Sequence, residues 1–235
     1  MKGEPVIPAP IPSFRTPSGA LPGGRGVSPV SGADPLVLID ESVPASAELV
    51  RAMRGKPKIV RLERSGEPLQ VLAHAVEAAG TAASSVHLFS HGAPGALMLT
   101  AGGIGPASLL LEHRCIADLR AALAGRPLVL YGCAIGQGET GQRFVTALSY
   151  VLDAPVLATS TPTGAAERGG DWVLDVAAGD RPEAFPELID AERAADWPGL
   201  LPGSGSVTSS AGDGAETKSA DPSPGRRRAE RSGRT

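Results

Sequence analysis

Cys133 follows a short apolar run near the middle of the chain, at a place where a β-strand would present it. The run belongs to the stretch "LVLYGCAIGQGETG" (128–141), which continues into glycines. His91 has a similar setting, because it ends the stretch "VHLFSH" (86–91) and precedes another glycine. In a thiol–imidazole pair, the histidine promotes thiolate formation and later protonates the leaving amine. The two residues therefore indicate nucleophilic catalysis.

The elements that would position them alternate between strand-like and helix-like segments. We expect strands at 36–40, 58–63, 84–91, 127–132, 154–160 and 171–176, the last at a sheet edge. We expect helices at 44–55, 67–80, 106–125 (with a break near His113) and 139–153. Apolar strands in alternation with helices predict an α/β fold with three layers, in which helices cover both faces of a mostly parallel sheet.

In such a sheet, functional groups gather at the carboxyl ends of the strands, where His91 and Cys133 are expected. Neighbouring strands lie about 5 Å apart, so the two side chains could approach one substrate bond if their strands are adjacent. The helix that begins near Glu139 would also lower the pKa of the thiol modestly through its dipole.

The predicted fold occupies residues 34–201, and both flanking segments have a composition typical of disorder. Residues 1–33 and 202–235 are rich in Pro, Gly and Ser and have hardly any periodic apolar pattern. Such segments do not bury enough apolar surface to offset the entropy lost on ordering the chain.

Composition argues against several classes of function. A net charge of −3 and 3% aromatic residues supply neither the positive field nor the stacking platforms of a nucleic-acid-binding protein. No apolar stretch approaches the length of about 20 residues that spans a bilayer, and prolines interrupt the start where a cleavable signal peptide needs an apolar run. Cys115 and Cys133 lack the spacing of a zinc site, so we expect no metal; a disulfide between them stays open.

The glycines after Cys133 offer a second interpretation of the same loop. Gly136, Gly138 and Gly141 form the G-x-G-x-x-G pattern of dinucleotide-binding turns. That pattern normally opens the first βαβ unit and has an acidic residue about 20 positions later. Here it follows the fourth predicted strand, and "LATSTPTG" (157–164) contains no acid. We therefore expect no cofactor and keep dinucleotide binding as the weakest alternative.

The paired motifs Ser-His-Gly and Gly-Cys, each after an apolar strand, resemble the signature of the caspase-like cysteine peptidases (clan CD, with caspases, gingipains, legumains and separases). A nearer resemblance is to a bacterial family of unassigned function, often found near the start of long, repeat-rich secreted surface proteins. The blocks that carry it cover residues 34–201 and are, in order, "LVLIDESV", "VHLFSHGAPGALML", "LVLYGCAIGQGETGQRFV", "ATSTPTGAAERGGDWVLD" and "DWPGLL".

The resemblance implies a caspase-like fold with His91 as acid–base and Cys133 as nucleophile. It also implies an oxyanion hole made by the backbone N–H groups of Gly92 and Cys133, a peptide or protein substrate, and a secreted or cell-surface location. The leading hypothesis is a cysteine endopeptidase or self-processing domain, that is, a hydrolase. The alternative is a non-catalytic, adhesin-associated binding module, because the sequence contains no evident third catalytic group.

Acidic residues near the same sheet edge are candidates for a substrate pocket. The resemblance implies that the region of Asp40 and Glu41 lines the pocket for the residue before the scissile bond, where an acid would favour Arg or Lys. Asp171 is the other candidate. Alternatively, Asp40 and Glu41 cap a helix or are solvated, and Asp171 simply begins a strand.

The histidine and cysteine candidates also have purely structural interpretations. Cys133 could be a small buried hydrophobe at a strand end, and His91 a turn residue bonded to backbone carbonyls. His87 lies two residues before Phe89 in the sequence and shares its face of the strand, which predicts a core histidine.

Overall fold

Short runs of leucine, valine and isoleucine form the strands of the main sheet. The computed structural model describes residues 33–80, 82–180 and 187–201, so the segments predicted to be disordered lie outside the described residues, apart from Ala33. The strands are β1 (Leu36–Ile39), β2 (Lys58–Arg61), β3 (Val86–Phe89), β7 (Leu128–Tyr131), β8 (Val156–Ala158) and β9 (Val176–Ala178). Their order is β2-β1-β3-β7-β8-β9, and within it β9 alone runs antiparallel to its neighbour. The predicted, mostly parallel sheet is confirmed.

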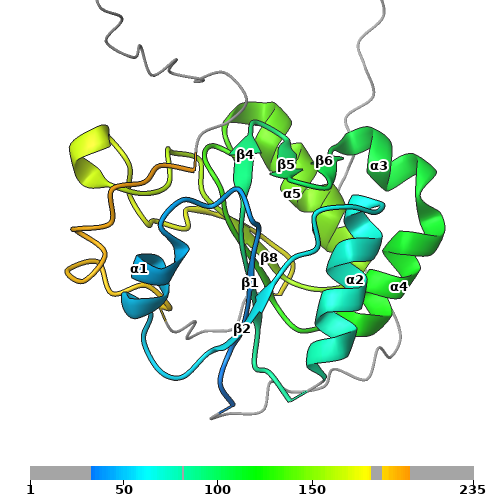
Figure 1. Cartoon of the computed structure of the whole chain (residues 1–235). Helices are drawn as coiled ribbons and strands as arrows, with labels where there is room; N and C mark the ends of the chain where they lie inside the picture. Colours follow the sequence, from blue (N-terminus) through cyan, green and yellow to red (C-terminus); the bar gives the residue numbers. More distant parts are fainter. Residues whose placement is uncertain (1–32, 81, 181–186, 202–235) are drawn as a thin grey trace, which may run out of the picture. The chain divides into compact units, whose positions relative to one another are not determined.

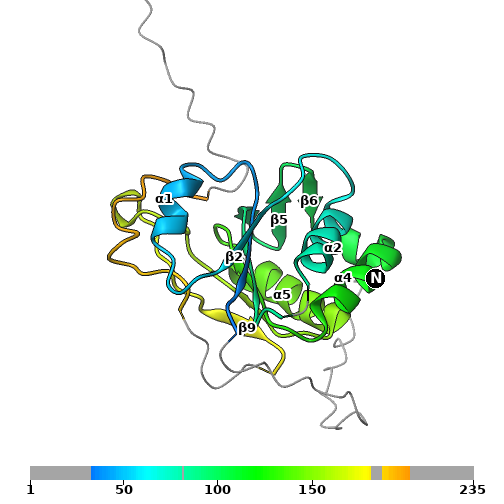
Figure 2. The ribbon, with the colours of Figure 1, turned by 60° about the horizontal axis from the view of Figure 1, so that its bottom comes forward.

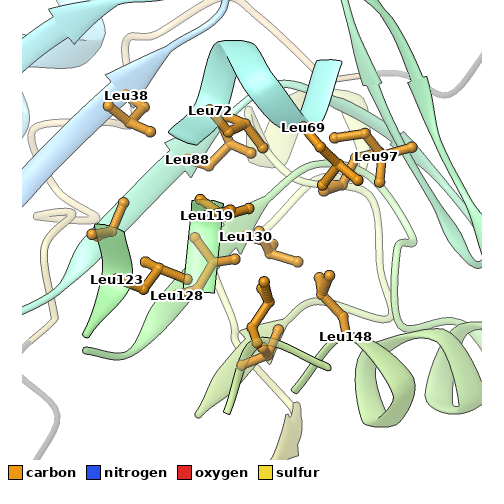
Figure 3. Packing of buried hydrophobic residues seen from close by; sticks show 14 of the residues in the cluster. Leu38, Leu69, Leu72, Leu88, Leu97, Leu119, Leu123, Leu128, Leu130 and Leu148 are labelled. Carbon is orange, nitrogen blue, oxygen red and sulfur yellow. The ribbon is translucent and has the colours of Figure 1, made fainter. Parts of the chain in front are cut away.

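Helices α2 (Pro68–Ala79), α4 (His113–Leu123) and α5 (Gly138–Leu152) lie on one face of this sheet (Figure 1). Their apolar stripes pack on alternate strand residues and form a leucine-rich core (Figure 3). The leucines labelled there are Leu38, Leu69, Leu72, Leu88, Leu97, Leu119, Leu123, Leu128, Leu130 and Leu148. None of the helices in the described part of the chain is long and apolar enough to cross a membrane.

The opposite face has a different cover. Helix α1 (Ser46–Arg51) lies on it, on the side of the sheet away from α2 (Figure 2). Much of the rest of this layer is the non-helical segment 187–201, whose buried residues pack on the strand residues of that face. Helices thus cover both faces, as predicted, although one face relies mainly on irregular chain.

The predicted helix over 106–125 divides in two. It consists of α3 (Pro106–Leu111) and α4, which are separated at Glu112, where φ is −104° and ψ is 47°. These angles interrupt the helical hydrogen bonding, which confirms the break expected near His113.

A second sheet follows His91, where we predicted only a glycine-rich turn. Its strands β4 (His91–Ala93), β5 (Ala96–Leu99) and β6 (Gly102–Ile104) pair antiparallel in that order. Strands this short, with several glycines and alanines, leave little pattern in a sequence. The sequence had suggested that His91 ends the strand β3. Instead, His91 begins a strand of this small sheet.

The last strand of the main sheet also differs from the prediction. β9 covers 176–178, whereas we expected a strand at 171–176. The Asp171 N–H donates to the Pro162 carbonyl at 2.9 Å, and the Asp171 carbonyl accepts the Gly164 N–H at 3.0 Å. These bonds hold residue 171 beside the loop after β8, so the chain pairs with β8 only from Val176 onward. Its expected place at the sheet edge is confirmed.

His87 is a core histidine, as its position in the strand predicted. Its side chain is 1% exposed, and Nε2 lies 2.9 Å from Ser85 Oγ. The imidazole also stacks with the Tyr131 ring at a centroid distance of 5.9 Å. Burial disfavours the charged ring and lowers the pKa of His87 to about 3.

This low pKa makes the stability of the fold depend on pH. The unfolded chain takes up the proton near pH 6.5, whereas the folded chain does so only near pH 3, so acidification favours unfolding between these values. Replacing His87 with Gln removes that proton uptake. We expect the free energy of unfolding of H87Q, from urea titrations at pH 7, 6 and 5, to fall less steeply than that of the wild type, by up to about 1.4 kcal/mol per pH unit.

The matched control is His74→Gln, because His74 is exposed on α2. H74Q should follow the wild-type curve. Parallel pH curves for the wild type and H87Q would contradict the assignment of the acid sensitivity to His87.

Candidate active site

The sheet register brings the two catalytic candidates to adjacent strand ends. β3 and β7 are neighbours, and Phe89 pairs with Tyr131 at their carboxyl ends. The Ser90 N–H donates to the Tyr131 carbonyl at 3.1 Å, which continues the pairing past the strands. His91 and Cys133 each lie two residues beyond that last pair. The condition that their strands be adjacent is therefore met.

Glycines allow the backbone to come into direct contact just beyond these strand ends. A Cβ atom on Gly132 would lie 3.2 Å from the carbonyl carbon of His91. One on Gly92 would lie 3.0 Å from the carbonyl oxygen of Cys133 and 2.5 Å from the Ile135 side chain. Because real Cβ atoms do not approach other atoms this closely, only glycine fits at Gly92. The backbone of the His91 segment thus packs on that of the Cys133 segment.

The imidazole of His91 is bonded at one nitrogen, and its other nitrogen has no partner among the described residues. Nε2 lies 3.2 Å from the Ser42 carbonyl oxygen, which can only accept, so Nε2 carries the proton in the neutral ring. Nδ1 is then the basic nitrogen. It is buried and has no hydrogen-bond partner among the residues that the structure describes. This ring has the tautomer of a general base with a vacant acceptor.

Backbone groups surround Cys133, which is 7% exposed. The Thr163 N–H donates to Sγ at 3.2 Å, and Sγ lies 3.8 Å from the Thr163 carbonyl oxygen. The Cys133 N–H donates to the Leu201 carbonyl at 3.0 Å. Burial raises the pKa of the Cys133 thiol, although backbone hydrogen bonds at Thr163 and Leu201 act in the opposite direction. We expected the start of α5 to lower this pKa, but the pKa is raised because the thiol is buried.

Asp40 lies beneath the site and does not face solvent. Its side chain is 1% exposed. Oδ1 accepts hydrogen bonds from the Ser42 N–H at 3.0 Å, from the Ser42 hydroxyl, and from the Thr100 hydroxyl at 2.8 Å. Oδ2 accepts the Thr100 N–H at 2.9 Å. A carboxylate engaged in this way does not fit the expected contact with a basic substrate residue.

The other two acidic candidates also interact within the protein. Glu41 is exposed and forms an ion pair with Arg64 at 2.7 Å. Asp171 is half-buried, and its Oδ1 accepts the Thr161 hydroxyl and the Val173 N–H, both at 2.9 Å. The hydrogen bonds and ion pairs of these two carboxylates, as found in the described part of the chain, do not reach His91 or Cys133.

The glycine pattern after Cys133 is explained by packing. The N–H groups of Ala134 and Gly136 donate to carbonyls of the loop after β8, at 2.9 and 2.8 Å. A Cβ on Gly141 would lie 2.2 Å from the carbonyl carbon of Gly136, so helix α5 can pack on this loop only with glycine there. These N–H groups and this glycine thus serve the packing of the loop and the helix.

Sequence reasoning missed three residues that contact the site, namely Ser42, Thr163 and Leu201. Ser42 and Leu201 contribute carbonyl oxygens, and Thr163 contributes its N–H and carbonyl. Contacts made by the backbone leave no chemical signature in side-chain types. In residues 33–80, 82–180 and 187–201, no cluster of three or more His, Cys, Asp or Glu side chains could hold a metal ion.

Comparisons with known proteins place the chain in a family. No curated protein matches the sequence. Two solved structures resemble it: "structure of pro-sf-caspase-1" (18% identity, TM-score 0.32, 63% of this chain and 67% of that one) and "Crystal Structure of Caspase-1 from Spodoptera frugiperda" (15% identity, TM-score 0.30, 59% and 66%). Residues 36–201 match the family described as "Domain of unknown function (DUF4347)". The chain with this Cys133–His91 sheet edge therefore belongs to the DUF4347 family.

Proposed function

We propose that this domain is a cysteine peptidase, either an endopeptidase or a self-processing domain, with Cys133 as nucleophile and His91 as acid–base. The observation that carries the proposal is the His91 ring, which combines a protonated, anchored Nε2 with a buried Nδ1 that lacks a partner among the described residues. An unpartnered buried base is costly to keep, and this one belongs to a segment that packs directly on the Cys133 backbone. The caspase-like sequence motifs point the same way.

The steps of the reaction follow from these groups. Nδ1 of His91 takes the proton from Sγ, and the thiolate attacks the carbonyl carbon of the substrate. The backbone N–H groups of Cys133 and Gly92 stabilise the resulting oxyanion. When the C–N bond breaks, the imidazolium gives its proton to the leaving amine, and a thioester remains on Sγ. Water, deprotonated by Nδ1, then hydrolyses the thioester and restores the thiol.

The Ser42 carbonyl takes the role that a carboxylate plays in many triads. It accepts the Nε2 proton and so fixes both the tautomer and the orientation of the ring. It also stabilises the imidazolium that forms during the reaction. This answers the apparent lack of a third catalytic group, because a backbone carbonyl is invisible in the sequence pattern.

A binding module without turnover is the second candidate function. It is favoured by the burial of Cys133 and by the raised pKa of its thiol, since a catalytic thiol normally has a lowered pKa. In that case the same sheet edge would bind a partner peptide, and Cys133 would serve only in packing.

Removal of the Cys133 thiol distinguishes a peptidase from a binding module, because only a peptidase needs the thiol for turnover. We expect Cys133→Ala to reduce the cleavage of a fluorogenic peptide panel by about 10³-fold or more, because the nucleophile is lost. His91→Ala should reduce it by about 10²–10⁴-fold. Cys115→Ala is the matched control, because Cys115 lies on α4 and its thiol pKa is raised to about 11, mainly by a hydrogen bond with Glu67. Wild-type activity in C133A would contradict the peptidase proposal.

Asp40 should act as a positioning residue for His91. Its carboxylate holds Ser42, whose carbonyl holds the imidazole, and it also holds Thr100 at the end of β5, the strand that pairs with β4. In Asp40→Asn, an NH₂ group replaces one acceptor oxygen and opposes a buried N–H donor. We expect a stability loss of about 1–3 kcal/mol in urea titrations. We also expect a fall in kcat of up to about 10²-fold with little change in KM.

The control for Asp40→Asn is Asp118→Asn, an exposed acid on α4 that should leave both quantities unchanged. A loss of stability in D40N with unchanged kcat would show that Asp40 is only structural. A rise in KM alone would instead support contact with substrate.

A further inference from the structure

The last described residues lie beside the Cys133 loop as an extended peptide. The Leu201 N–H donates to the Thr163 carbonyl at 3.0 Å, and the Ala165 N–H donates to the Gly199 carbonyl at 2.9 Å. Leu200 forms an antiparallel bridge with Gly164 between these two bonds. Segment 199–201 thus pairs with 163–165 in the way that a peptide adds a strand to an edge.

The carbonyl at the end of this segment lies on the nucleophile's own backbone. The Leu201 oxygen accepts the Cys133 N–H at 3.0 Å. In acyl transfer, the N–H of the nucleophilic residue is one of the donors that bind the oxygen of the attacked carbonyl. The Leu201 carbonyl oxygen therefore occupies a donor that would bind the oxygen of a reacting carbonyl.

The side chain of Leu201 occupies an apolar environment next to the nucleophile. It is fully buried and belongs to the apolar cluster that also contains Cys133, Tyr131 and Trp197. The backbones of the two segments also pack closely, because a Cβ on Gly164 would lie 2.5 Å from the Gly199 oxygen. The site is thus shaped for an extended chain with an apolar residue before the reacting bond.

We propose that residues 199–201 occupy the substrate groove of their own domain, as an internal inhibitor that mimics a peptide with leucine at the acyl position. This inference rests on the proposed peptidase function and gives it a substrate class and a form of regulation. The preference is for an apolar residue, not for the Arg or Lys that an acidic pocket would select. The segment must leave before Cys133 can react.

The burial of the Cys133 thiol is consistent with residues 199–201 occupying the site. Leu201 bonds to the Cys133 backbone while Thr163 bonds to Sγ, and the buried thiol has a raised pKa. The preceding residues are anchored separately, since the Trp197 indole N–H donates to the Pro44 carbonyl at 3.1 Å. Trp197 would therefore keep this bond when residues 199–201 detach.

The test measures the accessibility of Cys133 and does not require turnover. The full chain carrying Leu201→Gln is alkylated with iodoacetamide, a neutral reagent, and each cysteine is followed by peptide mass spectrometry. Glutamine is uncharged, so it weakens the burial of position 201 without a direct charge effect on the thiol. We expect the alkylation rate of Cys133 to rise about tenfold or more, because the segment opens locally. The rate of Cys115 should not change.

Two further variants serve as a control and as an independent test. Leu111→Gln, at a leucine that is 78% exposed on α3, should behave as the wild type. Gly199→Ala should displace the segment sterically, because its Cβ would lie 2.4 Å from the Trp197 ring. This variant should also increase the alkylation rate of Cys133. Unchanged Cys133 rates in folded L201Q and G199A, judged by an intact thermal transition, would overturn the proposal.

The substrate class is tested with peptide aldehydes, which form a reversible hemithioacetal with a thiol. In L201Q, acetyl-Pro-Gly-Leu-leucinal should protect Cys133 from iodoacetamide, and acetyl-Pro-Gly-Leu-argininal should protect it far less. Equal protection would overturn the apolar preference. If Cys133 is uncovered and protected as expected but no peptide is cleaved, the occupancy stands and only the peptidase function fails.

Discussion

The candidate site depends on the parallel pairing of β3 with β7. This pairing sets Phe89 opposite Tyr131 and continues through the Ser90 N–H, so the two chains leave the sheet side by side. Beyond that point they touch through their backbones, which is possible because position 92 has no side chain. A shift of the register by one residue would turn the site residues to the other face of the sheet. Strand pairing therefore fixes where the His91 and Cys133 segments leave the sheet.

A buried carboxylate then fixes the imidazole from the opposite side. Asp40 bonds to Ser42 and to Thr100, and Ser42 in turn accepts from His91. Burial of a carboxylate costs free energy unless its oxygens are hydrogen-bonded, and here both oxygens are. The acid that the sequence suggested for a substrate pocket thus works inside the protein. The charge at this position is bonded to residues of two loops, one after β1 and one after β5.

The sequence predicted the strands and helices whose apolar residues form a long run or a regular stripe. It did not predict the strands that are too short to show such a pattern. Strands such as β1 and β7 are uninterrupted apolar runs, and α5 has a clear buried stripe, so their order was readable. The small sheet β4–β6 consists of three- and four-residue strands, which carry no usable pattern. His91 and Cys133 could be proposed from the sequence because their side chains carry chemistry. Ser42, Thr163 and Leu201 were missed because they act through backbone atoms.

If residues 199–201 occupy the proposed site, Leu201 explains both the burial of the Cys133 thiol and the apolar surroundings of that thiol. Leu201 supplies the carbonyl that engages the Cys133 N–H, and its side chain joins the apolar cluster beside the thiol. Burial then disfavours the thiolate, so a covered nucleophile has a raised pKa without being an inert residue. The peptidase and binding interpretations therefore share the same contacts. They differ in what happens once residues 199–201 detach from 163–165, because only a peptidase then forms a thioester at Cys133 and hydrolyses it.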